Sequence, residues 1–102
     1  MSSFVKVATV QEIPPGQAKS VEVHDRQIAL FNIAGSFYAV DNLCTHAGGP
    51  LAEGMLEGSQ VECPWHGARF DVKTGSALTA PASESVASYI VRVNGSDIEV
   101  EI

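Results

Sequence analysis

Basic residues are scarce in this sequence, and long hydrophobic runs are missing. Six Lys and Arg residues stand against twelve Asp and Glu residues, which gives a formal net charge of -6. This balance disfavours nucleic acid and anionic membranes as partners, and it favours proteins that carry a basic patch. No apolar stretch approaches the roughly 20 residues that span a bilayer, and the opening MSSFVKV lacks the hydrophobic segment of a signal peptide. We therefore expect a soluble, cytoplasmic protein.

Cysteine is equally scarce, because the chain has only two. One disulfide is formally available, but a reducing cytoplasm favours metal binding or catalysis as the use of two thiols. The 102 residues fit one domain, residues 1–102, which can bury a modest core without needing a metal or a disulfide to fold. A bound metal would then serve function rather than folding.

Alternating apolar and polar residues predict short strands toward both ends of the sequence. Turn-forming residues separate these strands, notably IPPG at 13–16, the polar turn at 24–26, the stretch 34–36 and the hairpin pair Asn94-Gly95. We expect an all-β fold that contains an antiparallel meander. The predicted strands cover residues 4–10, 18–25, 26–36, 37–42, 86–93 and 97–102.

The regular pattern fades between Leu43 and Ala82, where glycine and proline recur. Only short strands fit this stretch, such as SQVEC at 59–63 and ARFDV at 68–72. A helix over 51–58 is disfavoured because Gly54 and Gly58 would each cost about 1 kcal/mol relative to alanine. We expect a loop-rich subdomain, about residues 43–82, inserted into a regular β frame and carrying the chemistry.

Both cysteines and two of the three histidines lie in this stretch, as two mixed pairs. Cys44 and His46 form a C-x-H box, and Cys63 and His66 form a C-x-x-H box in which a turn can bring both side chains to one centre. The set suits tetrahedral zinc, although zinc fingers usually pair like ligands with like. The order of the ligands argues against zinc, whereas the mixed loops fall naturally on either side of a 2Fe-2S cluster in which the cysteines hold one iron and the histidines the other.

The segment CTHAGGPLAEGMLEGSQVECPWHGARFDVKTGSALTAPA closely resembles the cluster-binding region of Rieske ferredoxins, and the rest of the chain resembles them more weakly. The resemblance implies an all-β Rieske fold in which antiparallel sheets carry an inserted cluster-binding subdomain, and a single 2Fe-2S cluster. Cys44 and Cys63 would bind the inner iron, and His46 and His66 the outer one. A third loop at Ala80–Ala82 would cover the cluster.

The resemblance also implies a function in electron transfer. Such ferredoxins carry one electron from a flavin-dependent reductase to a terminal dioxygenase that acts on aromatic rings, and they are not enzymes themselves. We expect a monomer when the protein is free, and no catalytic residues, since no third group accompanies Cys63 and His66 as a nucleophilic site would require. Two alternatives stay open: a small Rieske subunit of another oxidoreductase such as nitrite reductase, and a zinc-stabilised interaction module.

The sequence lacks hydrogen-bond donors that raise the reduction potential of some Rieske clusters. Rieske proteins of respiratory and photosynthetic chains carry an extra cysteine in each ligand loop and a nearby serine and tyrosine. The matching positions here are Gly49, Trp65, Ala68 and Phe70. Without those hydrogen-bond donors the reduced cluster is less stabilised, so we expect a potential near the low end of the range, about -150 mV.

Other residues of interest have simpler interpretations. We expect His24 to be a solvated turn residue, Gly75 to serve a turn, and Arg69 and Lys73 to be solvated in preference to contacting a partner. Trp65 suits packing and cluster shielding equally. We expect the subdomain core to include Phe70, Val72 and Leu78. We expect a solvated acidic face to be formed by Glu53, Glu57 and Glu62.

Overall fold

The fold is built almost entirely of antiparallel strands. The computed structural model of the chain describes residues 3–43, 50–64, 67–78 and 85–101. Within these ranges, no helix is long and apolar enough to cross a membrane. The elements are β1 (Phe4–Thr9), η1 (Val10–Glu12), β2 (Ala18–Val23), β3 (Arg26–Ile33), β4 (Ser36–Asp41), η2 (Leu51–Glu53), β5 (Met55–Glu57), β6 (Gln60–Glu62), β7 (Arg69–Asp71), β8 (Ser88–Tyr89), β9 (Val91–Asn94) and β10 (Asp97–Glu101).

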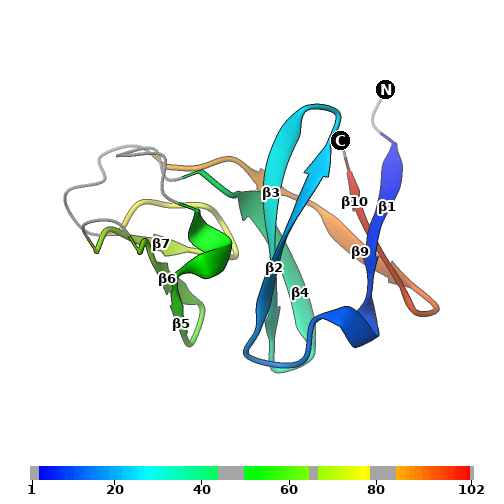
Figure 1. Ribbon diagram of the computed structural model, residues 1–102, viewed down its shortest axis with the longest axis horizontal. Helices are drawn as coiled ribbons and strands as arrows, with labels where there is room; N and C mark the ends of the chain where they lie inside the picture. Colours follow the sequence, from blue (N-terminus) through cyan, green and yellow to red (C-terminus); the bar gives the residue numbers. More distant parts are fainter. Residues whose placement is uncertain (1–2, 44–49, 65–66, 79–84, 102) are drawn as a thin grey trace.

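These strands form three sheets that lie one after another across the molecule (Figure 1). One sheet has the order β1-β10-β9, the second β2-β3-β4-β8, and the third β5-β6-β7. All the strand pairs are antiparallel. The all-β prediction is confirmed, and so is the meander, which is β2-β3-β4. The small β5-β6-β7 sheet lies inside the stretch in which only short strands were expected.

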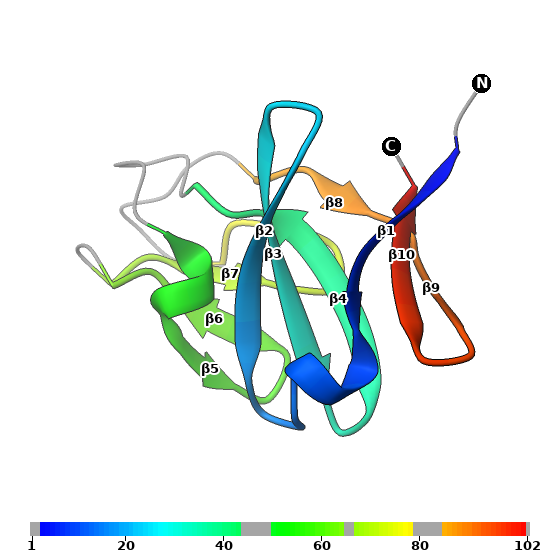
Figure 2. The same cartoon turned by 45° about the vertical axis from the view of Figure 1, so that its right-hand side comes forward.

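The β2-β3-β4-β8 sheet is the centre of the molecule, because it packs on both of its faces (Figure 2). Successive side chains of a strand point to opposite faces. Accordingly Ile28 and Leu30 of β3 pack in the cluster shared with β1 and β10, while Ala29 and Phe31 pack in the cluster shared with the small sheet. The small sheet of the subdomain is therefore packed on the buried middle of β3, residues 28–32.

Tight two-residue turns join the strands of the meander. His24 and Asp25 connect β2 to β3 with φ angles of 49° and 66°, and Ala34 and Gly35 connect β3 to β4 with φ angles of 53° and 93°. Left-handed angles at both positions give the turn a twist that matches the flanking strands. His24 is exposed there, as predicted.

Three local predictions need correction. The expected strand over 86–93 is interrupted at Ile90, which is 61% exposed, so that β8 joins one sheet and β9 another. The β9–β10 turn consists of Gly95 and Ser96, because Asn94 still pairs with Asp97. Leu78 was expected in the core but is 43% exposed, whereas Phe70 and Val72 are buried as predicted.

Candidate functional site

Most residues of the predicted cluster site fall in three segments that the described residues frame. Cys44 and His46 lie in 44–49, His66 and Trp65 lie in 65–66, and the Ala80–Ala82 stretch lies in 79–84; all of these are outside the described residues. Cys63 is described. We call residues 43–50 the first ligand loop, residues 63–68 the second ligand loop and residues 75–86 the covering loop.

The second ligand loop is closed at its base by Cys63 and Ala68. The backbone N–H of Cys63 donates a hydrogen bond to the carbonyl oxygen of Ala68 at 2.7 Å, directly after β6 pairs with β7. Cys63 is 1% exposed and packs in the core cluster with Leu51, Val61 and Phe70. Its thiol thus belongs to the packed interior, where a metal ligand is held in one orientation.

Asn42 closes the base of the first ligand loop. Its carbonyl oxygen accepts a hydrogen bond from the N–H of Leu51 at 2.6 Å, and its side-chain Oδ1 accepts one from the N–H of Ala52 at 2.8 Å. Leu43 and Pro50 form a β-bridge just inside these bonds. The two ends of the segment that carries Cys44 and His46 are therefore tied together. Sequence analysis missed Asn42, because its partners Gln27, Leu51 and Ala52 are not its neighbours in the sequence.

The covering loop is closed by Gly75 and Val86. The N–H of Val86 donates to the carbonyl oxygen of Gly75 at 2.8 Å, and the N–H of Ala77 donates to Ser85 Oγ at 3.2 Å. Gly75 has a φ of 82°, and a Cβ at this position would stand 2.1 Å from the carbonyl oxygen of Val86. Gly75 does lie in a turn, as predicted, but it also permits a close approach of two backbone segments. Hydrogen bonds therefore close the base of each of the three loops that carry the predicted cluster site.

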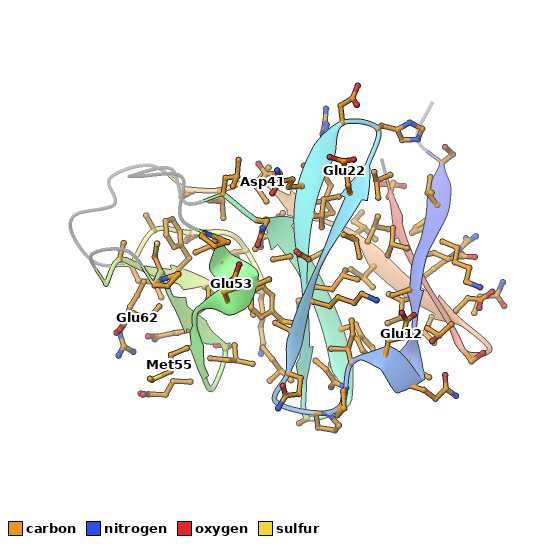
Figure 3. The ribbon with its side chains drawn as sticks, viewed as in Figure 1. Glu12, Glu22, Asp41, Glu53, Met55 and Glu62 are labelled. Carbon is orange, nitrogen blue, oxygen red and sulfur yellow. The ribbon has the colours of Figure 1, made fainter. Side chains whose placement is uncertain are left out.

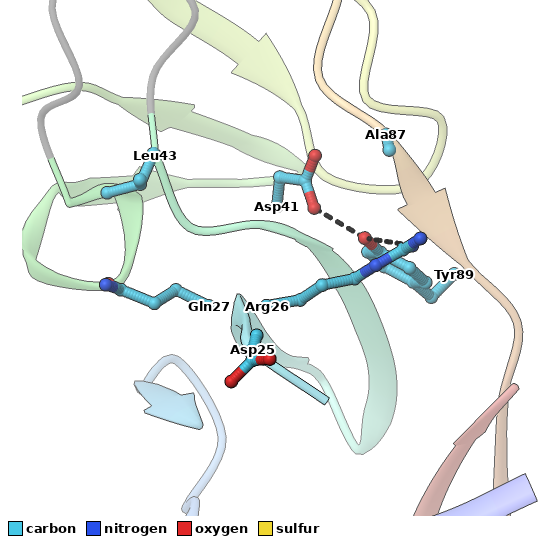
Figure 4. Close-up of a pocket in the computed structure, with 7 residues that line it drawn as sticks. All are labelled: Asp25, Arg26, Gln27, Asp41, Leu43, Ala87 and Tyr89. Atoms are coloured by element: carbon cyan, nitrogen blue, oxygen red, sulfur yellow. Dashed lines mark hydrogen bonds between the residues drawn. The ribbon is translucent and has the colours of Figure 1, made fainter. Parts of the chain in front are cut away.

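Two hollows lie beside these loop bases. One, of about 410 Å³, is lined by Glu53, Gly54, Met55, Glu62, Cys63, Pro64 and Gly67. The other, of about 320 Å³, is lined by Asp25, Arg26, Gln27, Asp41, Leu43, Ala87 and Tyr89 (Figure 4). The first hollow places an exposed methionine and two carboxylates next to the one predicted ligand that the structure describes.

A hydrogen-bonded group crosses the second hollow from β3 to β8. Tyr89 donates its hydroxyl proton to Asp41 Oδ1 at 2.6 Å, and Arg26 Nη1 donates to the Tyr89 hydroxyl oxygen at 3.4 Å. Burial of the phenol raises the pKa of Tyr89 above its ordinary value, and the hydrogen bond to the Asp41 carboxylate raises this pKa further. The arrangement holds β8 against the end of β4, just before the first ligand loop.

Arg69 makes ion pairs within the small sheet. Its guanidinium lies 3.1 Å from Glu62 and 3.8 Å from Glu57, across the β5-β6-β7 strands. Arg69 was expected to be solvated, but its charge is compensated by these two glutamates. Glu53, on η2, is exposed and lies on the same part of the molecule as Glu62 (Figure 3). Glu22, by contrast, lies on β2 of the central sheet. Lys73 lies over the ring of Tyr38, with 5.7 Å from Nζ to the ring centroid.

The donor set of the two boxes fits a 2Fe-2S cluster with mixed ligation. The buried thiol of Cys63 and its fixed backbone suit a thiolate ligand. Within the described ranges there is no cluster of three or more His, Cys, Asp or Glu side chains placed to hold a metal ion. The described part of the chain therefore offers no competing metal site.

Comparison with known proteins identifies the family. Residues 3–90 match the Rieske [2Fe-2S] domain. The chain belongs to the Rieske family. The ferredoxin component of a naphthalene 1,2-dioxygenase system from Pseudomonas aeruginosa is 38% identical over 99 residues, which cover 97% of this chain and 95% of the relative.

Solved Rieske structures share the whole fold. The ferredoxin of carbazole 1,9a-dioxygenase from Nocardioides aromaticivorans IC177 superposes with a TM-score of 0.92 at 36% identity, covering 96% of both chains. A complex of reduced oxygenase and oxidized ferredoxin in carbazole 1,9a-dioxygenase gives 0.89 at 32% identity, covering 95% of this chain and 91% of that one. A putative NADH-dependent nitrite reductase small subunit from Mycobacterium tuberculosis gives 0.89 at 26% identity, covering 100% and 96%.

These matches decide several predictions. The Rieske fold and the 2Fe-2S cofactor are confirmed, so the zinc-stabilised module is wrong. The relatives are ferredoxin components of dioxygenase systems, which confirms the interpretation of this Rieske protein as an electron-transfer component and not an enzyme.

Proposed function

We propose that this Rieske protein is a soluble, cytoplasmic one-electron carrier that takes electrons from a flavin-dependent ferredoxin reductase and delivers them to a terminal dioxygenase acting on aromatic rings. The observation that carries the proposal is its end-to-end likeness to a dioxygenase ferredoxin component, 97% of this chain against 95% of the relative. A further support is the similarity to the ferredoxin found in complex with its oxygenase.

We further propose that Cys44 and Cys63 hold one iron and His46 and His66 the other. The support is the mixed spacing of the two boxes, the burial of Cys63, and the closed base of each loop. The cluster supplies a site that accepts and releases one electron. Two thiolates and two neutral imidazoles give an oxidised centre of formal charge zero, so the added electron meets less repulsion than in a four-cysteine cluster and the potential is higher.

The domain proposal follows from the same assignment. Residues 1–102 form a single Rieske domain, with a cluster-binding subdomain of about residues 43–82, and the free protein is a monomer. A net charge of -6 suits a carrier that must meet two basic surfaces in turn and leave each of them. The alternative is a small subunit held permanently by another oxidoreductase, which the nitrite reductase likeness supports at lower identity.

Metal analysis of matched histidine variants tests the ligand assignment. His46→Ala and His66→Ala should each abolish the cluster, measured as iron and acid-labile sulfide per chain and as the rhombic EPR signal of the reduced protein. His24→Ala is the control, because His24 is the remaining histidine and lies exposed in the β2–β3 turn. An equal loss of iron in His24→Ala, or full retention in either of the other two, would remove the assignment.

Electron delivery tests the function. Two equivalents of the reduced protein, mixed with the terminal oxygenase of a naphthalene dioxygenase system, its aromatic substrate and O2, should be reoxidised as they supply the two electrons of one turnover that forms product.

Gel filtration of cell extract should show the protein migrating alone. Co-migration with a large oxidoreductase at all salt concentrations would favour the permanent subunit instead.

A further inference from the structure

Among the described residues, the side chains of two polar residues are buried inside the core: Asn32, 4% exposed, and Asn42, 3% exposed. A buried amide is costly unless it is hydrogen-bonded, so each one specifies a particular backbone arrangement around it. The two lie near opposite ends of the central sheet, on β3 and just after β4. They form a natural pair for comparison.

Asn32 organises the end of the sheet that is remote from the ligand loops. Its Nδ2 donates to the carbonyl oxygen of Ile13 at 2.7 Å, and its Oδ1 accepts from the N–H of Gly35 at 2.8 Å. These bonds tie the segment after η1 to the β3–β4 turn. These bonds stabilise the β sheets, and they contact neither of the ligand loops.

Asn42 joins three segments at the other end. Its N–H donates to the carbonyl oxygen of Gln27 on β3 at 2.9 Å, which fixes Asn42 to the central sheet. Its backbone and side-chain oxygens then accept from Leu51 and Ala52 at 2.6 and 2.8 Å, which fixes the start of η2. The first ligand loop therefore leaves from Asn42 and returns to Asn42.

We propose that Asn42 is a positioning residue for the cluster, acting through the first ligand loop. The inference rests on the proposed assignment of Cys44 and His46, which gives this loop one ligand to each iron. With Oδ1 absent, the N–H of Ala52 loses its acceptor, and η2 is tied to residue 42 only by the backbone bond from the N–H of Leu51. The far end of the loop is then fixed less firmly to its near end. Both ligands are then held less firmly, even though neither is altered.

Cluster retention in matched variants tests this proposal. Asn42→Leu and Asn32→Leu each replace a buried amide by an apolar side chain of similar size. We expect both holoproteins to show lowered thermal midpoints. Only Asn42→Leu should lose its visible absorbance faster in excess chelator, by up to about ten-fold relative to the unaltered protein, since removing a direct partner of a metal ligand costs about 10–100-fold in metal affinity and Asn42 contacts only the ends of the loop. Its reduced EPR spectrum should also shift, whereas that of Asn32→Leu should not.

A conservative variant separates positioning from simple destabilisation. Asn42→Asp keeps an acceptor for the N–H of Ala52, so it should hold the cluster longer than Asn42→Leu. If the leucine variants do not accumulate as folded holoprotein, Asn42→Ser and Asn32→Ser provide the same comparison. Equal rates of cluster loss from the two positions would overturn the proposal. Absence of a 2Fe-2S cluster from the unaltered protein would instead overturn the proposed function.

Discussion

Gly75 lies so close to Val86 that a Cβ on the glycine would stand 2.1 Å from the valine carbonyl oxygen. The N–H of Val86 in turn donates to the carbonyl oxygen of Gly75. Two backbone segments that leave β7 and enter β8 are thus in direct contact, without side chains between them. The contact sets where the covering loop begins and ends.

Gly75→Ala should therefore destabilise the protein more than its backbone angle alone requires. Gly16 is the matched control, since its φ of 81° is nearly that of Gly75, 82°, and a Cβ there would meet nothing within 4 Å. We expect Gly16→Ala to cost about 1–2 kcal/mol for the left-handed angle, and Gly75→Ala about 1–3 kcal/mol more for displacing Val86. Urea unfolding of both holoproteins measures the difference. Equal losses would show that the contact yields without cost.

Ala68 offers a direct way to raise the reduction potential. It is fully buried, and its carbonyl oxygen accepts the N–H of Cys63. A serine hydroxyl at this position would supply a hydrogen-bond donor near the cluster, which stabilises the more negative, reduced state. Ala68→Ser should thus move the potential upward from about -150 mV. Ala29→Ser is the control, because Ala29 is buried in the same cluster but lies on β3. Voltammetry giving the unaltered protein a value well above zero would contradict the starting premise.

The regular parts of the fold could be predicted because their local and tertiary preferences agree. The alternation along β2, β3 and β4 and the turn residues between them define the meander without any long-range information. The ligand boxes could be found for a similar reason, since paired Cys and His residues are rare and their spacing is informative. His24 was expected in a turn and lies exposed in the β2–β3 turn.

The parts that could not be predicted depend on distant contacts. The interruption of the 86–93 strand at Ile90 arises because β8 pairs with β4 whereas β9 pairs with β10, and nothing in the local pattern distinguishes these partners. Leu78 is apolar and was expected in the core, but it lies exposed at the edge of the small sheet, where its N–H donates to the carbonyl oxygen of Arg69. Asn42 was overlooked since its role depends on Gln27 and Ala52, which lie far from it in the sequence.

Glu12 should make stability depend on pH in the acid range. Its carboxylate accepts hydrogen bonds from the side chain of Lys19 and from Thr9, and these lower its pKa from 4.5 to about 2. A lowered pKa contributes stability that is fully present above pH 4.5 and is lost as the pH falls toward 2. Glu12→Gln should therefore unfold at a lower urea concentration than the unaltered protein at pH 6, with the gap narrowing at pH 3. Glu22→Gln, which replaces an exposed carboxylate on β2, is the control. A gap independent of pH would refute the expectation.

The acidic rim of the hollow beside Cys63 should govern docking of a basic partner. Glu53 is exposed on this rim, whereas Glu62 is already paired with Arg69. An exposed charge pair is worth about 0.2–1 kcal/mol, so Glu53→Gln should weaken binding to the terminal oxygenase of a naphthalene dioxygenase system by about 1.4- to five-fold at low salt. Screening should erase the difference in 1 M salt, where the Debye length falls to about 3 Å. Glu22→Gln changes the net charge equally, but Glu22 lies on β2 and is not part of this rim (Figure 3). Titration calorimetry at both salt concentrations measures the effect, and equal weakening by the two variants would mean that total charge, and not this rim, controls the encounter.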